Sequence, residues 1–181
     1  DRRAAGTFTV MYKGKILMKN NIVLIGMPGV GKSTVGVILA KELGYQFLDA
    51  DLLIQKRENR LLKDIIAQEG VDGFIEIENQ VNASIEAERT VVATGGSVVY
   101  GQEAMAHLKD IATVIYLRLS YEELRRRLGN LKNRGVVLRK GQTLEDLYRE
   151  RIVLYEKYAD LIVDEENKGI EETLQAIVKV L

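Results

Sequence analysis

A run of glycines followed by a lysine and a hydroxyl residue is the feature of this sequence best suited to chemistry. Residues 24–36 read LIGMPGVGKSTVG, and the spacing G-x-x-x-x-G-K-[ST] is met by Gly26, Gly31, Lys32 and Ser33. Positions without a Cβ let consecutive backbone N–H groups curve around an anion, and the helix that follows adds the positive end of its dipole. The lysine can reach the β- and γ-phosphates, and the serine hydroxyl can coordinate Mg²⁺.

This motif predicts that the chain binds a nucleoside triphosphate or descends from one that did. A glycine-rich strand–helix turn that binds nothing is disfavoured, because four fixed positions occur between an expected strand and an expected helix. We expect the nucleotide to contact the loop and the first helical turn, namely Gly26, Gly29, Val30, Gly31, Lys32, Ser33 and Thr34.

Two acidic residues follow the next expected strand. In FLDADLLI, residues 47–54, Asp49 and Asp51 stand two apart at the carboxyl edge of a strand, where ligands bind in open α/β sheets. Residues i and i+2 of an extended strand point the same way, so one carboxylate can hold the metal's water shell and the other an acceptor hydroxyl. The alternative is a pair of solvated acids that begin a helix. Beside a phosphate loop, we favour the functional interpretation.

Glycines also follow the third expected strand, in TGGS at residues 94–97. Glycines at the carboxyl edge of a strand let a ligand approach the backbone closely. A tight turn without a ligand explains the same residues. The sequence leaves both interpretations open at this point.

The composition excludes several kinds of site. Lysine plus arginine and aspartate plus glutamate each number 26, so no overall charge favours nucleic acid or an anionic membrane. No apolar run reaches the roughly 20 residues that span a bilayer. Cysteine is absent and His107 is the single histidine, which rules out disulfides, thiolate catalysis and sites with two histidines. We expect a cytoplasmic monomer that acts on a small molecule, without nucleic-acid or membrane partners.

Strand-like and helix-like segments alternate along the chain. Apolar and β-branched runs predict strands over 21–26, 45–54, 90–96, 112–119 and 160–164, and helical spacing predicts helices over 34–44, 52–89, 121–130, 143–159 and 170–181. The region 52–89 is expected to break into two or three helices near Gly70 and Gly73. This alternation indicates a mostly parallel sheet covered on both faces, in one domain.

The first residues form a separate question. Met18 looks like a natural start, so we expect 1–17 to be an extension or a cloning remnant and the domain to run over 18–181. The segment TFTVMYKGKIL alternates well enough to be a strand or a hairpin. We assign it no function.

The order of these motifs resembles shikimate kinase. Over nearly all of 21–181 the chain carries, in order, GMPGVGKST, FLDAD, Phe74 with Glu78 four residues on, TGG, RRRLGN, a basic loop and R-x-x-L-Y-x-x-x-A-D-x-x-V-D. The resemblance implies an α/β phosphate-loop kinase fold of three layers, with a five-stranded parallel sheet, helices on both faces, a lid over 130–145 and a small helical substrate-binding subdomain over 52–90. It also implies ATP and Mg²⁺ as cofactors, and transfer of the γ-phosphate to the 3-hydroxyl of shikimate in aromatic amino-acid biosynthesis.

The resemblance also implies roles for residues on the nucleotide side. Lys32 and Ser33 would bind phosphate and Mg²⁺, and Asp49 would belong to the metal shell. Arg126 falls where the family's arginine packs on adenine.

Further residues fall at the lid and the acceptor site. The lid arginine that reaches the transferring phosphate falls at Arg134, with Arg139 as the rival, and phosphoryl transfer does need positive charge there. A solvated basic turn is the alternative for this loop. The resemblance makes Asp51 the residue that binds the acceptor hydroxyls and the candidate base. It places the glycines that contact substrate, and an arginine that clamps the substrate carboxylate, at Gly95, Gly96 and Arg151.

Three positions depart from the family's pattern. Ile75 stands where shikimate kinases carry an arginine that shares the substrate carboxylate with the one at Arg151. Ser97 stands at the third glycine of a triple, and Val153 where a proline follows the clamp arginine. Isoleucine cannot replace a bidentate guanidinium contact, and a buried acceptor left unpaired costs about 1–3 kcal/mol.

Several functions therefore stay open at the level of the sequence. The enzyme phosphorylates shikimate, more weakly bound or with another cation near Arg151, or its pocket takes another hydroxylated acceptor such as a hydroxy amino acid or a sugar acid. A non-catalytic nucleotide-binding relative is a further alternative. A nucleotide kinase or GTPase switch is disfavoured, because no N-K-x-D motif is found and 55–90 offers few well-placed arginines.

Overall fold

The computed structural model describes residues 9–12, 15–129, 136 and 138–181. Its centre is a five-stranded parallel sheet in the order β4-β5-β3-β6-β7, and β1 and β2 form a separate antiparallel pair. The strands are β1 Thr9–Tyr12, β2 Lys15–Met18, β3 Asn21–Ile25, β4 Gln46–Asp49, β5 Thr90–Ala93, β6 Ala112–Arg118 and β7 Leu161–Asp164. The predicted parallel sheet is confirmed, and the strand character expected before Asn21 is seen in the antiparallel pair β1 and β2.

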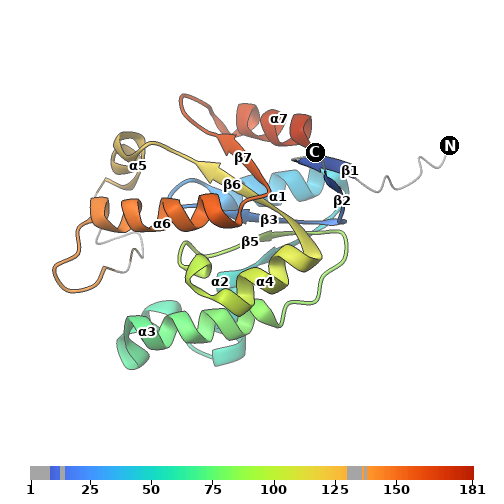
Figure 1. The fold of residues 1–181 in the computed structure, drawn as a ribbon. Coiled ribbons are helices and arrows are strands. Elements are labelled where there is room, and N and C mark those ends of the chain that lie inside the picture. The colour runs from blue at the N-terminus through green and yellow to red at the C-terminus, as the bar shows by residue number, and fades with distance from the viewer. Residues whose placement is uncertain (1–8, 13–14, 130–135, 137) are drawn as a thin grey trace.

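Helices cover both faces of the sheet, as Figure 1 shows. On one face lie α1 and α7, which contact each other, while α4 and α6 pack against β6 on the other face. Helix α3 packs on α4 and α2, away from the sheet. The helices are α1 Lys32–Leu43, α2 Ala50–Glu58, α3 Leu62–Ala83, α4 Gln102–Ile111, α5 Tyr121–Leu128, α6 Leu144–Tyr158 and α7 Ile170–Val180, with a 3₁₀ turn η1 Val98–Tyr100.

The strand order brings three loops to one edge of the sheet. β3 is central and fully buried, pairing with β5 on one side and β6 on the other, and β4 pairs with β5. A strand covered on both faces must be apolar throughout, which NIVLI satisfies after its first residue. Because parallel strands end at the same edge, the loops that follow β3, β4 and β5 lie side by side there.

The structure corrects the expected geometry of the acidic pair. The predicted strand 45–54 ends at Asp49, because α2 begins at Ala50. Asp49 is the N-cap of α2, and its Oδ1 accepts from the backbone N–H groups of Asp51 at 2.9 Å and Leu52 at 3.2 Å. The two acids therefore do not share the face of an extended strand, and Asp51 is held by the first turn of a helix.

Of the two breaks expected in the helical region 52–89, the one near Gly70 is confirmed and the one near Gly73 is wrong. The predicted break in 52–89 occurs at Gly70, whose φ of 73° interrupts α3, whereas Gly73 lies within the helix. Helix α4 was not predicted. A small apolar cluster separate from the main core holds α2 against α3; its members are Ile54, Ile65, Phe74 and Val81.

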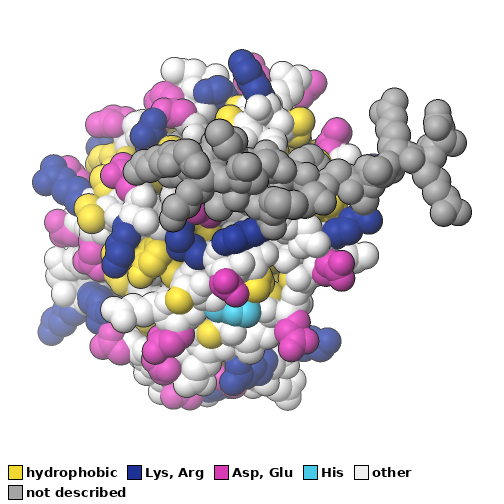
Figure 2. Space-filling model, turned by 45° about the vertical axis from the view of Figure 1, so that its right-hand side comes forward, with side chains coloured by type: hydrophobic (Ala, Val, Ile, Leu, Met, Phe, Trp, Pro, Cys, Tyr) yellow, Lys and Arg dark blue, Asp and Glu magenta, His cyan; other side chains and the backbone are white. Residues whose placement is uncertain are grey.

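On the face shown in Figure 2, basic and acidic side chains are interspersed. Within the described ranges, none of the helices has the length and apolar character needed to span a bilayer.

Candidate active site

The phosphate loop joins β3 to α1 and has the shape of an anion cradle. Gly26, Gly29 and Gly31 have φ values of 151°, 90° and 91°, which residues with a side chain rarely adopt. A Cβ on Gly26 would also lie 2.7 Å from the backbone oxygen of Leu117. Helix α1 begins directly after the loop, so its first N–H groups, which have no partner within the helix, are available to a phosphate.

Lys32 lies at the base of this loop. Its ammonium group donates to the backbone oxygens of Gly26 at 2.7 Å and Met27 at 2.9 Å, and the residue is 8% exposed. Burial lowers the pKa of Lys32 to about 8, and the negative charge of Asp51 opposes that shift. The loop thus holds a buried cation within the segment where the motif predicts the terminal phosphates to bind.

Ser33 and Asp49 meet across the loop. The Ser33 hydroxyl donates to Asp49 Oδ2 at 2.9 Å, while the other carboxylate oxygen caps α2. No cluster of three or more histidine, cysteine or acidic residues suited to a metal occurs in the described part of the chain. Mg²⁺ binds hard oxygen ligands and takes most of its shell from water and substrate phosphates. Ser33 and Asp49 are oxygen donors of the required kind.

A cavity of about 710 Å³ opens beside the phosphate loop. It brings together residues from both halves of the predicted site: Gly29, Gly31, Lys32, Ser33, Thr34, Asp51, Gly95, Gly96 and Arg151. Ile75 forms part of its apolar wall, and two further cations, Lys63 and Arg139, line it as well. Predicted phosphate-binding and acceptor-binding residues therefore share one space.

The two glycines after β5 make room for charged groups that converge on them. A Cβ on Gly95 would lie 2.8 Å from Asp51 Oδ1, and a Cβ on Gly96 would lie 2.8 Å from a terminal nitrogen of Arg151. Any larger residue would displace these side chains. Burial raises the pKa of Asp51, and the charge of Asp49 raises it further.

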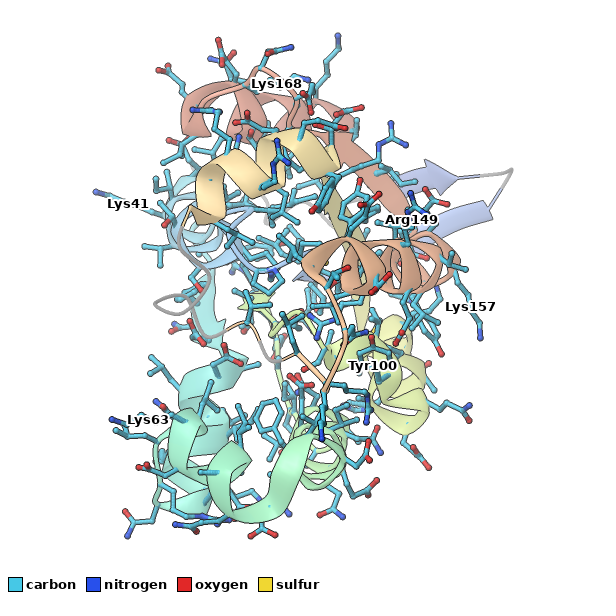
Figure 3. All side chains as sticks on the ribbon, turned by 90° about the vertical axis from the view of Figure 1, so that its left-hand side faces the viewer. Lys41, Lys63, Tyr100, Arg149, Lys157 and Lys168 are labelled. Carbon is cyan, nitrogen blue, oxygen red and sulfur yellow. The ribbon has the colours of Figure 1, made fainter. Side chains whose placement is uncertain are left out.

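Arg151 is a buried cation that faces the cavity. It is 5% exposed, and its guanidinium carbon lies 5.5 Å from the ring centre of Tyr100. Its Nε has no hydrogen-bond partner among the described residues. The nearby Tyr155 hydroxyl donates to the backbone oxygen of Gly96 at 2.6 Å and fixes the glycine pair. Figure 3 shows Tyr100 beneath α6, the helix that carries Arg151. A cation so placed can bind an anionic group in the cavity.

Glu78 also lines this cavity, although we assigned it no role from the sequence. It is 1% exposed, and the Ser97 hydroxyl donates to its Oε1 at 2.5 Å. Burial raises the pKa of Glu78 to about 7. A signal existed: the acid stands four residues after Phe74, on the face of α3 that packs inward.

A second cavity of about 300 Å³ lies on the other side of the phosphate loop. Its walls include Val30 of the loop and, from α5 and the segment after β7, Arg127, Glu165 and Lys168. Glu165 is 2% exposed, and its nearest cation is Arg127, with an ion-pair distance of 3.5 Å. In Figure 3, Lys168 marks this end of the molecule and Lys63 the opposite end, on α3.

The arginines expected around the nucleotide lie in different settings. Arg126 is exposed, donates to Glu123 at 2.7 Å and is not among the residues that line either cavity, so its contact with adenine stays a prediction. Arg134 lies outside the described residues. Its rival Arg139 lines the larger cavity and donates to Asp72 Oδ1 at 2.7 Å.

Comparison with known proteins identifies the family to which this chain belongs. The family model for shikimate kinase matches residues 28–181. The chain belongs to the shikimate kinase family. A shikimate kinase of Thermodesulfovibrio yellowstonii is 37% identical over 162 residues, which cover 88% of this chain and 93% of that protein. The expected resemblance is thus confirmed.

Solved structures agree with this membership. The structure of a shikimate kinase from Acinetobacter baumannii in complex with shikimate has a TM-score of 0.78 and 33% identity, and covers 88% of this chain and 91% of that one. A gluconokinase from Sinorhizobium meliloti has a TM-score of 0.53 at 20% identity over 88% of this chain and 90% of its own, which shows the fold alone. A shikimate kinase is a phosphotransferase with an alcohol acceptor that uses ATP and Mg²⁺, and the predicted phosphate-loop kinase fold is confirmed.

Proposed function

We propose that this chain transfers the γ-phosphate of ATP to a hydroxyl of shikimate, as the names of its relatives indicate for them. The observation that carries the proposal is the convergence of Asp51 and Arg151 on Gly95 and Gly96, in the cavity that Lys32 also lines. A hydroxylated carboxylic acid needs this combination of a hydroxyl acceptor and a cation. The family relationship supports shikimate and does not favour a hydroxy amino acid, a sugar acid or a non-catalytic role.

Each side chain then has a task that its position allows. Asp51 accepts the proton of the attacking hydroxyl, and its backbone is held by the N-cap of α2. Lys32 and the backbone N–H groups of the loop stabilise the charge on the transferring phosphate. Ser33 and Asp49 would hold Mg²⁺, which neutralises phosphate charge when bound. Arg151 orients the acceptor through its carboxylate.

The missing arginine at Ile75 does not leave Arg151 as the sole cation of the cavity. Lys63 and Arg139, the latter paired with Asp72, line the same space, so the cavity offers an anionic acceptor further positive charge. This favours the first of the two interpretations of Ile75, in which shikimate remains the acceptor. The apolar contribution of Ile75 itself predicts weaker binding than a second guanidinium would give.

An assay of ADP release tests the proposal directly. With Mg²⁺ and ATP, we expect turnover with shikimate, and a kcat/KM at least tenfold lower with homoserine or gluconate. The Asp51→Asn variant should lose kcat by a factor of about 10²–10⁴, the usual range for loss of a general base. Asp110→Asn, at an exposed position of α4, is the matched control and should behave as wild type. Preference for another acceptor would refute the proposal.

We also propose that the protein acts as a monomer in the cytoplasm. Both cavities form within a single chain, and the absence of cysteine suits a reducing compartment. Sedimentation equilibrium of the full chain should give the mass of one chain at micromolar concentration. A stable dimer would contradict the first part of this proposal.

A further inference from the structure

The carboxyl group of Glu78 is buried in the wall of the acceptor cavity, and only one of its oxygens is bonded. Ser97 donates to Oε1 at 2.5 Å, whereas Oε2 has no hydrogen-bond partner among the described residues. Buried polar atoms without a partner are rare in native proteins and call for an explanation. Because Glu78 lines the cavity, a ligand group is the partner to consider.

The unbonded oxygen of Glu78 faces Gly95. A Cβ on Gly95 would lie 2.6 Å from Glu78 Oε2 and 2.8 Å from Asp51 Oδ1. A Cβ on the next residue, Gly96, would lie 2.8 Å from a terminal nitrogen of Arg151. A small acceptor seated on both glycines can therefore contact Asp51 and Glu78 Oε2 over Gly95, and Arg151 over the adjacent Gly96.

The groups around Glu78 decide its protonation state. Burial raises its pKa to about 7; the Ser97 hydrogen bond and the charges of Arg151 and Lys32 lower the pKa, and the charge of Asp51 raises it. An acceptor carboxylate beside Arg151 adds another negative charge, which favours the neutral form of Glu78. A neutral carboxyl group carries one proton, and Oε2 is the oxygen free to present it.

We propose that the protonated carboxyl group of Glu78 donates a hydrogen bond from Oε2 to the carboxylate of the acceptor, beside the guanidinium of Arg151. This rests on the proposed function, because it concerns how the same site holds the same acceptor. Ile75 offers no donor at its place in the wall, and Glu78 supplies one instead. Ser97 orients the carboxyl group by occupying Oε1, which leaves the proton on the oxygen that faces the ligand.

Calorimetric titration of shikimate into the full chain tests this inference without involving the chemical step. In buffers of different ionisation enthalpy at pH 7.5, we expect wild-type binding to take up about 0.5–0.8 proton, because most Glu78 is ionised before binding and neutral after it. The wild-type Kd should rise with pH above about 7, approaching tenfold per pH unit.

Two variants on the same helix separate this role from a structural one. Glu78→Gln keeps a donor that cannot ionise, so its Kd should stay within about threefold of the wild-type value at pH 6, with no pH dependence or proton uptake from this group. Glu76→Gln is the matched control at an exposed position of α3. It should match the wild type in its Kd at pH 6, in the pH dependence of the Kd and in proton uptake.

Several outcomes would overturn the inference. Binding of shikimate to the wild type without proton uptake contradicts it, and this measurement does not depend on the folding of any variant. Affinity that increases with pH would show instead that ionised Glu78 accepts from an acceptor hydroxyl. Either result leaves the proposed function intact if shikimate is phosphorylated, whereas a failure of shikimate to bind would overturn both.

Discussion

The phosphate loop and the acceptor wall line the same cavity, but the loop offers mainly backbone groups and the wall offers side chains. The loop is a continuous segment whose ligands are mostly backbone N–H groups, with Lys32 held by two carbonyls of the same segment. The acceptor wall takes one side chain each from α2, α3 and α6, namely Asp51, Glu78 and Arg151, and gathers them around two glycines.

This difference explains why the loop keeps the family's pattern, whereas the acceptor side departs from it at Ile75. A site made of backbone depends on a few glycines and tolerates many other changes. A site made of separate side chains can be altered by one substitution, as Ile75 alters this one. We therefore expect substitutions on the loop side to change kcat, and substitutions on the acceptor side to change mainly the KM for the acceptor.

The largest effect is expected at the loop. Lys32→Met should lower kcat by about 10³-fold or more, because the cation stabilises charge that develops on the transferring phosphate. The KM for shikimate should change little. Lys41→Met, at an exposed position of the same helix, is the control. Steady-state kinetics measures both constants. A kcat of Lys32→Met close to the wild-type value would contradict the role assigned to the loop.

On the acceptor side, Arg151→Met should act in the opposite manner. We expect the KM for shikimate to rise about 10–150-fold, since hydrogen bonds to charged groups contribute about 1.5–3 kcal/mol. The effect on kcat should be smaller. Arg149→Met, at an exposed position of α6 where the native arginine pairs with Glu145, is the matched variant. A large loss of kcat with unchanged KM would count against a carboxylate clamp.

A gain of function would sharpen the comparison further. Ile75→Arg should lower the KM for shikimate about tenfold by adding a charged donor to the apolar wall. Ile75→Leu keeps the wall apolar and should leave the KM within about twofold. If the arginine variant binds shikimate no better, the acceptor carboxylate does not face this wall.

The smallest effect concerns stability and pH. The pKa of Glu78 is raised from 4.5 to about 7 in the folded protein, so the proton is held more tightly when the chain is folded. The resulting stability is fully present below pH 4.5 and is lost as the pH rises toward 7. The free energy of unfolding of the wild type relative to Glu78→Gln should fall by about 1–3 kcal/mol over that range.

Urea unfolding at several pH values measures this difference. Glu76→Gln, whose carboxylate is exposed, should show no comparable change relative to the wild type. A constant difference between the wild type and Glu78→Gln from pH 4.5 to 7 would mean that Glu78 is not held neutral in the folded protein.

Local patterns in the sequence were enough for the phosphate loop, because its contacts lie within one segment. They also located Asp49 and Asp51 but not their geometry, since the N-cap bond of Asp49 starts a helix one residue later and ends the strand early. Helix α4 escaped prediction although Ala104, Met105 and Leu108 lie on one helical face, because it runs directly into β6 without a glycine or proline to mark its end.

The acceptor wall required the three-dimensional structure. Gly96 and Arg151 are far apart in sequence, and their approach depends on how α6 packs against the turn after β5. Glu78 was visible as part of a motif, but its unbonded oxygen and its bond to Ser97 could be seen only after folding. The family resemblance supplied residue roles that spacing alone could not.

A crystal structure of the chain with ADP, Mg²⁺ and shikimate tests the central claim most directly. We predict a β-phosphate in the loop at Lys32, a shikimate hydroxyl within hydrogen-bond distance of Asp51, and the carboxylate between Arg151 and Glu78 Oε2. Shikimate bound outside this cavity, or with its carboxylate turned away from Arg151, would contradict the account.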